Sequence, residues 1–402
     1  MITCPVLSYG FSHHLFQQAA ELSRRVPGYR MVTTSFVSDR TVTRLRPLFP
    51  SLARSLARRS HPGVPADIVR TYPVEHSYQL AARLTRHSYS YFAAHDRMAR
   101  RILCDFSPPG TVLAIDTGAE NLFRAWKGRS RCILDLSIAT PHYREKIFSE
   151  AEASPNHHGV RFHHPGPWEL SRYAAELELA DLILCPSEFV MDSCRHLGVP
   201  AERLRLLPYG FEPGRFAPAA SPRPNTPPLR IVFAGTFFYR KGSHLLLEAF
   251  ARFQSDFPQA ELHVFGEVID RPRHLPANVT LHGRVPQETL AVRFREMDVM
   301  AFPTLFEGSA YVAYQALASG LPVITTRNCG SVVDASCGII LDEISADALY
   351  HALVRCQQNR PWLASLAAAA PVRVGHYTWS HYGERLYRIL TEGAAPATAS
   401  SS

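Results

Sequence analysis

Short apolar runs alternate with longer amphipathic stretches along the chain, and this alternation constrains the fold more than any other feature. Four such runs stand in the first half and four in the second, at residues 4–9, 111–115, 132–136, 182–185, 229–234, 261–265, 299–303 and 321–325. Strands that alternate with helical segments are typical of a parallel sheet with crossover helices. We therefore predict an α/β protein with two doubly wound, Rossmann-like domains.

A cluster of prolines separates the two sets of runs. Six prolines lie in one short stretch, at positions 213, 218, 222, 224, 227 and 228. Proline fixes the φ angle and lacks an N–H donor, so this density favours an extended linker over a packed helix or central strand. Since 402 residues exceed what one hydrophobic core usually organises, we predict a first domain at 1–212, a linker at 213–228 and a second domain at 229–375.

The two ends of the chain, its hydropathy and its net charge predict where the protein is located and what kind of partner it binds. The sequence has no run of about 18 apolar residues and no basic-then-apolar leader at Met1, which predicts a soluble cytoplasmic protein. Residues 392–402 are mostly small and are expected to form a disordered tail. The net charge of +8 favours an acidic partner: a nucleotide diphosphate, an anionic lipid surface or nucleic acid. Nucleic acid ranks last, because no recognition motif accompanies the charge.

The spacing of cysteine and histidine argues against a metal centre. The eight cysteines include no Cys-x-x-Cys pair, which is typical of buried free thiols in a reducing compartment. Histidine pairs at 13–14, 157–158 and 163–164 point to different sides of an extended chain, so the two rings do not converge on one ion. We predict no metal site, and only His14, near Gly10, is a candidate for lining an active site.

Two adjacent cations mark a candidate phosphate site in the second domain. The apolar run 231–234 leads into a loop with Arg240 and Lys241, and an apolar helix follows Gly242. A strand-loop-helix junction offers unpaired backbone N–H groups and the positive end of a helix dipole, and the two cations add charge for a diphosphate. Taken alone, such a loop is more often a solvated turn.

A carboxylate follows a later strand of the same domain. The run that ends at Pro303 leads into a glycine loop with Glu307 and Gly308, and the next predicted helix carries Gln315. Open α/β sheets bind ligands at the carboxyl ends of their strands. A carboxylate at that edge can accept hydrogen bonds from two sugar hydroxyls.

These segments resemble glycosyltransferase family 4, a group of retaining enzymes with the GT-B fold that is recognised by a Glu-x7-Glu motif. Residues 179–188, 207–212 and 377–380 also resemble the family's last strand of the first domain, its exit into the linker and its entry to the closing helix. The resemblance extends from about Asp181 to Leu390. It implies an interdomain cleft and a C-terminal helix at 376–391 that packs back on the first domain.

The resemblance implies a role for each residue of the donor site. Arg240 and Lys241 would hold the diphosphate of a nucleotide-diphosphate sugar, and Glu307 would bind sugar hydroxyls. The backbone amides of four residues would face the sugar and the phosphate: Gly308, Ser309, Ala310 and Tyr311. Arg284 and Val285 fall where the family contacts the base. No cofactor and no metal ion are implied.

The sequence departs from the family pattern at three places. The second Glu of the motif, which binds the ribose, is Gln315, whose amide can still hydrogen bond but carries no charge. Thr236 stands where many members have a phosphate-binding Arg, so Arg240 would supply the second cation. The family often has a histidine at the end of a strand in the first domain, whereas Asp116 and Asp135 end the corresponding strands here.

These aspartates are candidates for binding the acceptor substrate. Asp135, Asp116 and His142 are candidates for contact with the acceptor, and a desolvated carboxylate can act as a local base. The preferred interpretation is that each aspartate caps the turn after its strand. We nevertheless include Asp135 with Glu307, Lys241 and Arg240 among the predicted catalytic residues.

The predicted function is that of a retaining, metal-independent glycosyltransferase. It would move a sugar from a nucleotide-diphosphate sugar to a glycan, a lipid-linked or a small-molecule acceptor, in polysaccharide or glycoconjugate biosynthesis. Two alternatives stay open, because a fold does not determine chemistry. One is a catalytically degenerate GT-B subunit that binds nucleotide sugars, and the other is an enzyme like a nucleotide-sugar epimerase.

A basic, amphipathic segment stands apart from the donor site. Residues 44–59 combine five arginines with the apolar residues Leu45, Leu48, Phe49, Leu52 and Leu56. One interpretation is peripheral docking to the anionic inner face of a membrane. The other, which we prefer at this level, is an ordinary surface helix, because Pro47 and Pro50 confine any helix to the second half of the segment.

Overall fold

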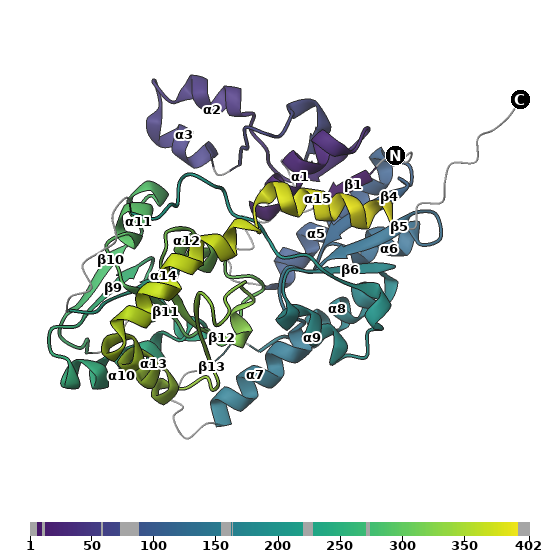
Figure 1. The fold of residues 1–402 in the computed structure, drawn as a ribbon. Coiled ribbons are helices and arrows are strands. Elements are labelled where there is room, and N and C mark those ends of the chain that lie inside the picture. The colour runs from purple at the N-terminus through teal and green to yellow at the C-terminus, as the bar shows by residue number, and fades with distance from the viewer. Residues whose placement is uncertain are drawn as a thin grey trace, which may run out of the picture.

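The computed structural model describes residues 6–9, 13–57, 59–72, 88–153, 162, 164–219, 228–270 and 274–392. Two parallel sheets organise this part of the chain, each flanked by helices (Figure 1). The first has the strand order β3-β2-β1-β4-β5-β6-β7 and the second β10-β9-β8-β11-β12-β13. The predicted α/β class with two doubly wound sheets is confirmed.

The first sheet consists of β1 (Val6–Tyr9), β2 (Arg30–Thr33), β3 (Val69–Thr71), β4 (Thr111–Ile115), β5 (Arg131–Asp135), β6 (Leu182–Cys185) and β7 (Leu204–Leu206). Every residue of β4 and β6 is buried. Strands covered on both faces read as continuous apolar runs, which explains why these segments stood out in the sequence. The strand order reverses between β1 and β4, and such a switch point is where open α/β sheets bind ligands.

The helices of the first domain are α1 (His13–Arg25), α2 (Asp39–Leu45), α3 (Pro50–Ala57), α5 (Ser88–Asp105), α6 (Glu120–Trp126), α7 (Pro141–Ala153), α8 (Pro167–Leu179) and α9 (Glu188–Arg195). Single helical turns lie at η1 (Ala66–Ile68) and η2 (Ala201–Arg203). The N-terminus of α9 is capped by Ser187, whose hydroxyl accepts from the N–H of Val190. The start of α3 at Pro50 agrees with the expectation that the prolines shorten the basic segment's helix.

The second sheet consists of β8 (Arg230–Ala234), β9 (Glu261–Phe265), β10 (Val279–Gly283), β11 (Val299–Phe302), β12 (Val323–Thr326) and β13 (Gly338–Leu341). Its helices are α10 (Ser243–Asp256), α11 (Gln287–Phe294), α12 (Tyr311–Ala318), α13 (Ala346–Gln358) and α14 (Arg360–Gly375), with helical turns at η3 (Tyr239–Lys241) and η4 (Arg327–Cys329). In this sheet too the order reverses, here between β8 and β11. The loops after β8 and β11 carry Arg240, Lys241 and Glu307.

The last helix, α15 (Trp379–Thr391), returns to the first domain and packs against α1 (Figure 1). Its Leu386 is fully buried in the same hydrophobic cluster as Leu15. The chain enters α15 beside the exit of the first domain, where the N–H of Phe211 donates to the carbonyl of Tyr377. A Cβ at Gly210 would lie 2.4 Å from the backbone N of Trp379, so only glycine permits this crossing.

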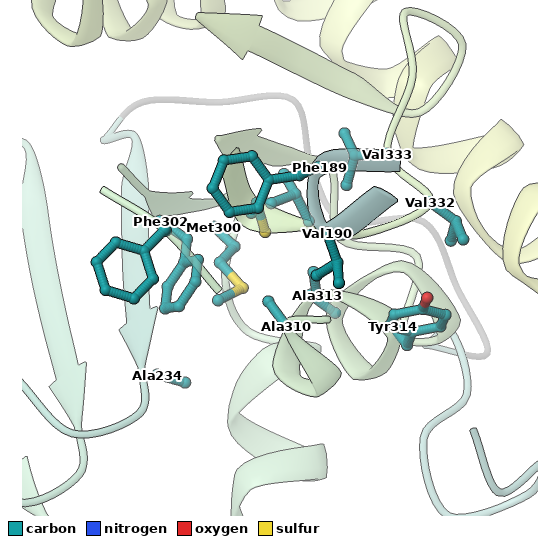
Figure 2. Close-up of a cluster of buried hydrophobic side chains, with 14 of the residues drawn as sticks. Phe189, Val190, Ala234, Met300, Phe302, Ala310, Ala313, Tyr314, Val332 and Val333 are labelled. Atoms are coloured by element: carbon teal, nitrogen blue, oxygen red, sulfur yellow. The ribbon is translucent and has the colours of Figure 1, made fainter. Parts of the chain in front are cut away.

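The two domains share buried hydrophobic contacts. Phe189 and Val190 of α9, in the first domain, belong to one cluster with Met300, Ala313 and Val333 of the second. Figure 2 shows Phe189 and Val190 among the side chains of the second domain. This contact lies beside the loop that carries Glu307, and it therefore helps to position the candidate site.

Some of the predicted features involve residues that the structure does not describe. Residues 220–227 of the predicted linker, residues 393–402 of the predicted tail, Gly10 and the histidines at 157, 158 and 163 lie outside the described residues. Among the helices that are described, none is both long and apolar enough to span a bilayer.

Candidate functional site

Arg240 and Lys241 lie in the helical turn η3, directly before α10. Gly242 ends this turn in the left-handed conformation, with φ +73°. A Cβ at Gly242 would stand 2.0 Å from the carbonyl oxygen of Pro303, so glycine alone allows the turn to pack on the segment after β11. This close packing places the two cations next to the loop that carries Glu307.

The two cations converge on one carboxylate oxygen. Glu307 Oε1 lies 3.1 Å from Arg240 Nη1 and 3.3 Å from Lys241 Nζ. All three side chains are at least three-quarters buried, which strengthens their attraction relative to a surface pair. Arg240 Nη1 also donates to the carbonyl of Phe306 at 2.8 Å. The cluster carries one net positive charge, because two cations share one anion.

The loop that carries Glu307 is hydrogen bonded to η4. The N–H of Glu307 donates to the carbonyl of Asn328 at 2.8 Å, and the N–H of Ala310 donates to the carbonyl of Cys329 at 3.1 Å. The Ala310 amide is therefore bonded within the protein, and its predicted donation to a ligand requires that this bond open. Among the described residues, none accepts from the N–H of Gly308 or Ser309, which keeps these two available.

Gly308 lies directly on the first domain. A Cβ at this position would stand 1.8 Å from the carbonyl oxygen of Ser137, which follows β5. Its own carbonyl accepts a hydrogen bond from Ser187 Oγ at 2.7 Å. Ser137 and Ser187 were not predicted as site residues. Their only sequence signal is that each follows closely on the end of a predicted strand.

Gln315 is buried and already has a partner. Its Nε2 donates to Oε1 of Gln287 at 2.7 Å, and Gln287 is the first residue of α11. Gln287 follows Arg284 by only three residues, so the pair joins the two segments predicted to contact the ribose and the base. Sequence reasoning missed Gln287, because the partner of Gln315 lies 28 residues away in the chain.

The predicted base-binding residues differ in their surroundings. The Arg284 side chain is 69% exposed and forms an ion pair with Glu267. Val285 is partly buried and packs against the hydrophobic core. An exposed cation paired at the surface is easily redirected to a ligand, whereas the Val285 side chain is held by its packing.

Asp135 lies in a buried polar network at the carboxyl end of β5. Its Oδ2 accepts from Gln18 Nε2 at 3.0 Å and lies 3.1 Å from His14 Nε2. The ring of His14 stacks on Tyr209, with centroids 4.7 Å apart. Only 2% of Asp135 is exposed, and its carboxylate is already bonded within this network. Its predicted catalytic role stays a prediction, and the contact with His14 is one through which Asp135 can orient that ring.

The other two predicted acceptor contacts, Asp116 and His142, are both at least partly buried. Asp116 accepts from the N–H of Ser137 at 3.1 Å and from the hydroxyl of Tyr173 at 2.6 Å, and burial raises the pKa of its carboxyl group. The capping interpretation fits this geometry. His142 lies in the first turn of α7, and partial burial lowers the pKa of its ring.

Glu176 is a buried carboxylate that the sequence did not reveal. It accepts from the backbone N–H groups of Thr117 and Ala119, at 2.7 and 2.9 Å, where the chain leaves β4 and begins α6. Burial raises the pKa of Glu176 to about 8. Thr117 has a positive φ of 72°, so Glu176 stabilises a strained turn at the same edge of the sheet as Asp116.

Comparison with known proteins places this site in context. Residues 228–359 match the family model described as "Glycosyl transferases group 1". The chain is 26% identical over 254 residues to D-inositol 3-phosphate glycosyltransferase of Corynebacterium jeikeium, covering 55% of this chain and 60% of that protein. It is also 26% identical over 166 residues to glycogen synthase of Mycobacterium tuberculosis, covering 39% and 40%. The chain spans about half the length of the curated relatives it matches.

Solved structures with the same fold cover nearly the whole chain. Sucrose-phosphate synthase from Thermosynechococcus elongatus superposes with a TM-score of 0.63 at 17% identity, covering 96% of this chain and 98% of that one. Anabaena HepE in complex with UDP-glucose gives 0.61 at 13% identity, covering 97% and 100%. These similarities show that the architecture is the GT-B fold.

Proposed function

We propose that this chain, whose residues 228–359 match the group 1 glycosyltransferase family, transfers a sugar from a nucleotide-diphosphate sugar to an acceptor, with retention at the anomeric carbon. The observation that carries the proposal is the convergence of Arg240 and Lys241 on Glu307 at the carboxyl edge of the second sheet. A protein of the same fold supports the donor class, since HepE was solved with UDP and with UDP-glucose.

The chemistry requires stabilisation of a leaving diphosphate. When the bond between the anomeric carbon and the diphosphate oxygen breaks, its electron pair stays on that oxygen, and negative charge develops there. Arg240 and Lys241 neutralise this charge, and the N–H groups of Gly308 and Ser309 add hydrogen bonds. Preorganised donors of this kind act most strongly where charge develops in the transition state.

Glu307 changes partners during donor binding. Without a ligand, it is the counter-ion of both cations. A bound diphosphate competes for these cations, which frees the carboxylate to accept hydrogen bonds from the hydroxyls of the donor sugar. Binding of the diphosphate to the two cations therefore favours binding of the sugar by Glu307, so we expect a complete nucleotide sugar to bind better than either part alone.

Gln315 and Gln287 are proposed to bind the nucleoside. Two neutral amides offer donors and acceptors to ribose hydroxyls without a fixed charge. Arg284 and Val285 lie on the segment just before α11 and would contact the base. On the acceptor side, His14, oriented by Asp135, is the proposed polar contact.

A donor panel tests the function. Thermal midpoints are measured with UDP-, GDP- and ADP-sugars, because a ligand that binds the folded state raises the midpoint. One donor is expected to raise it in the wild type and in Lys146→Ala, a control at an exposed lysine, but not in Lys241→Ala. Release of free sugar or transfer to an acceptor by that donor should fall by about a hundredfold or more in Lys241→Ala. If no nucleotide sugar shifts the midpoint, the proposal is wrong.

A degenerate binding subunit is the second candidate. It is favoured by Gln315, which replaces the carboxylate of the family motif and whose amide is already bonded to Gln287. Such a subunit would bind the donor as tightly as an enzyme but show neither hydrolysis nor transfer. The donor panel separates the two candidates, because it measures binding and turnover on the same sample.

A further inference from the structure

Helices α2 and α3 follow β2 and precede β3 in the chain. They form a helical hairpin that projects from the first domain (Figure 1). The two helices pack on each other, with Val42 and Ala53 buried. At the base, the N–H of Val37 donates to the carbonyl of Arg59 at 2.9 Å. The hairpin is thus a compact unit whose tip points away from the sheet.

The tip exposes three large apolar side chains within five positions. Leu48 is 74% exposed, Phe49 55% and Leu52 49%. Leu48 and Phe49 lie in the turn between the helices, and Leu52 lies in the first turn of α3. An apolar group of this density on a surface indicates an interaction site rather than solvent contact.

The charge around the tip has a single sign. Residues 40–66 contain six arginines and no Asp or Glu, with the arginines at positions 40, 44, 46, 54, 58 and 59. Within the described part of the chain, Arg44, Arg46 and Arg54 pair with no carboxylate. Arg54 donates only to its own helix, to the carbonyl of Pro50 and the hydroxyl of Ser51. The apolar tip is therefore flanked in sequence by three arginines that have no carboxylate partner among the described residues.

We infer that the α2–α3 hairpin docks on an anionic lipid bilayer. Leu48, Phe49 and Leu52 insert at the boundary between headgroups and acyl chains, while the arginines bind lipid phosphates. This combination fits a bilayer better than nucleic acid, because two of the three exposed side chains are aliphatic and do not stack on bases. It also fits better than an acidic protein surface, since unpaired arginines flank the apolar tip on both sides in sequence.

The position of the hairpin connects docking to the candidate site. It leaves the sheet at the carboxyl end of β2, the edge where β4 and β5 present Asp116 and Asp135. Docking would therefore bring the acceptor side of the molecule toward the lipid. This last step rests on the proposed transferase function, whereas the docking itself does not.

Vesicle sedimentation tests the inference without donor or acceptor, so its outcome is independent of activity. The full chain is mixed with phosphatidylcholine vesicles, or with vesicles that also contain phosphatidylglycerol, at low and high salt. We expect sedimentation with the anionic vesicles only, weakened by salt because surface charges are screened. Leu48→Ser/Phe49→Ser/Leu52→Ser and Arg44→Gln/Arg46→Gln should each lower the partition coefficient by roughly tenfold or more.

Matched controls make the result specific. Val372→Ser removes an apolar side chain that is 70% exposed on α14, and Arg100→Gln/Arg327→Gln removes two exposed arginines elsewhere. Both controls should sediment like the wild type, and all variants should keep the wild-type thermal midpoint, because the substituted side chains are exposed. The inference is overturned if the wild type does not sediment with anionic vesicles, or if the hairpin variants sediment as well as the controls.

Discussion

Lys241 Nζ lies 3.3 Å from Glu307 Oε1, although the two residues belong to different loops that follow β8 and β11. Arg240 approaches the same oxygen. A carboxylate that two cations share is a counter-ion as well as a candidate ligand for sugar hydroxyls. Because of this double role, a single substitution at Glu307 should strengthen the binding of the diphosphate and slow the transfer of the sugar.

Glu307→Gln should tighten the binding of a nucleoside diphosphate several-fold, because the cations lose their internal competitor. The same change should lower the rate of transfer by about tenfold or more, because the amide binds sugar hydroxyls less strongly than a carboxylate does. Calorimetric titration with UDP or GDP measures the first effect, and steady-state kinetics measure the second. Weaker diphosphate binding in this variant would contradict the counter-ion role.

Gln315→Glu should preserve or improve donor binding. The new carboxylate cannot donate to Gln287, but the amide of Gln287 can rotate and donate to the carboxylate instead. Gln315→Leu should weaken donor binding by about tenfold, which corresponds to the loss of one good hydrogen bond. A double-mutant cycle with Gln287→Ala gives the coupling between the two amides. Loss of donor binding in Gln315→Glu would mean that the amide acts as a donor to a buried acceptor.

Gly308→Ala should separate the loop that carries Glu307 from the first domain. The added Cβ would lie 1.8 Å from the carbonyl oxygen of Ser137, so one of the two backbones must move. A displacement near 1 Å at a reacting site costs about a hundredfold in rate. Gly375→Ala is the control, because a Cβ at Gly375 meets no atom within 4 Å. Equal kcat/KM for both variants would argue against a tight interdomain contact in the active state.

Asp135→Ala should destabilise the first domain. It removes the buried acceptor of Gln18 and the partner of His14, and an unsatisfied buried group costs about 1–3 kcal/mol. Asp135→Asn keeps an acceptor for Gln18 and should cost less. Urea denaturation compares the two free energies of unfolding. If both variants unfold like the wild type, the network has no structural role.

Glu176 should make stability depend on pH. Burial raises the pKa of Glu176 from 4.5 to about 8, so the folded state holds a proton that the unfolded state releases within that range. The contribution of Glu176 is therefore fully present below 4.5 and declines as the pH rises toward about 8.

The Glu176→Gln variant isolates this effect. Burial lowers the pKa of His95 to about 3, which changes stability in the opposite direction at acidic pH in both proteins. The difference in the free energy of unfolding between wild type and variant removes the His95 contribution. That difference should shift in favour of the variant between pH 4.5 and about 8. A constant difference over this range would mean that Glu176 remains ionised in the folded protein.

The sequence by itself determined the architecture and the location of the two loops that form the candidate donor site. Apolar periodicity and turn residues report on contacts within a few positions of the chain, so the strand runs and the loops with Arg240 and Glu307 were visible locally. The exposed tip at Leu48 was visible only as a basic, amphipathic segment. Its prolines were correctly expected to shorten the helix, but the exposure of its apolar side chains was not predicted.

Only the tertiary structure decided which of these groups meet. The order of the strands in each sheet places Lys241 beside Glu307, and it places His14 beside Asp135 across 121 positions of the chain. Burial was equally hidden: the sequence left Asp135 either as a cap of the turn after its strand or as a contact for the acceptor, and did not show that helix α1 covers it. Pairing and desolvation depend on how whole elements pack, and a local pattern carries no information about the neighbour across the sheet.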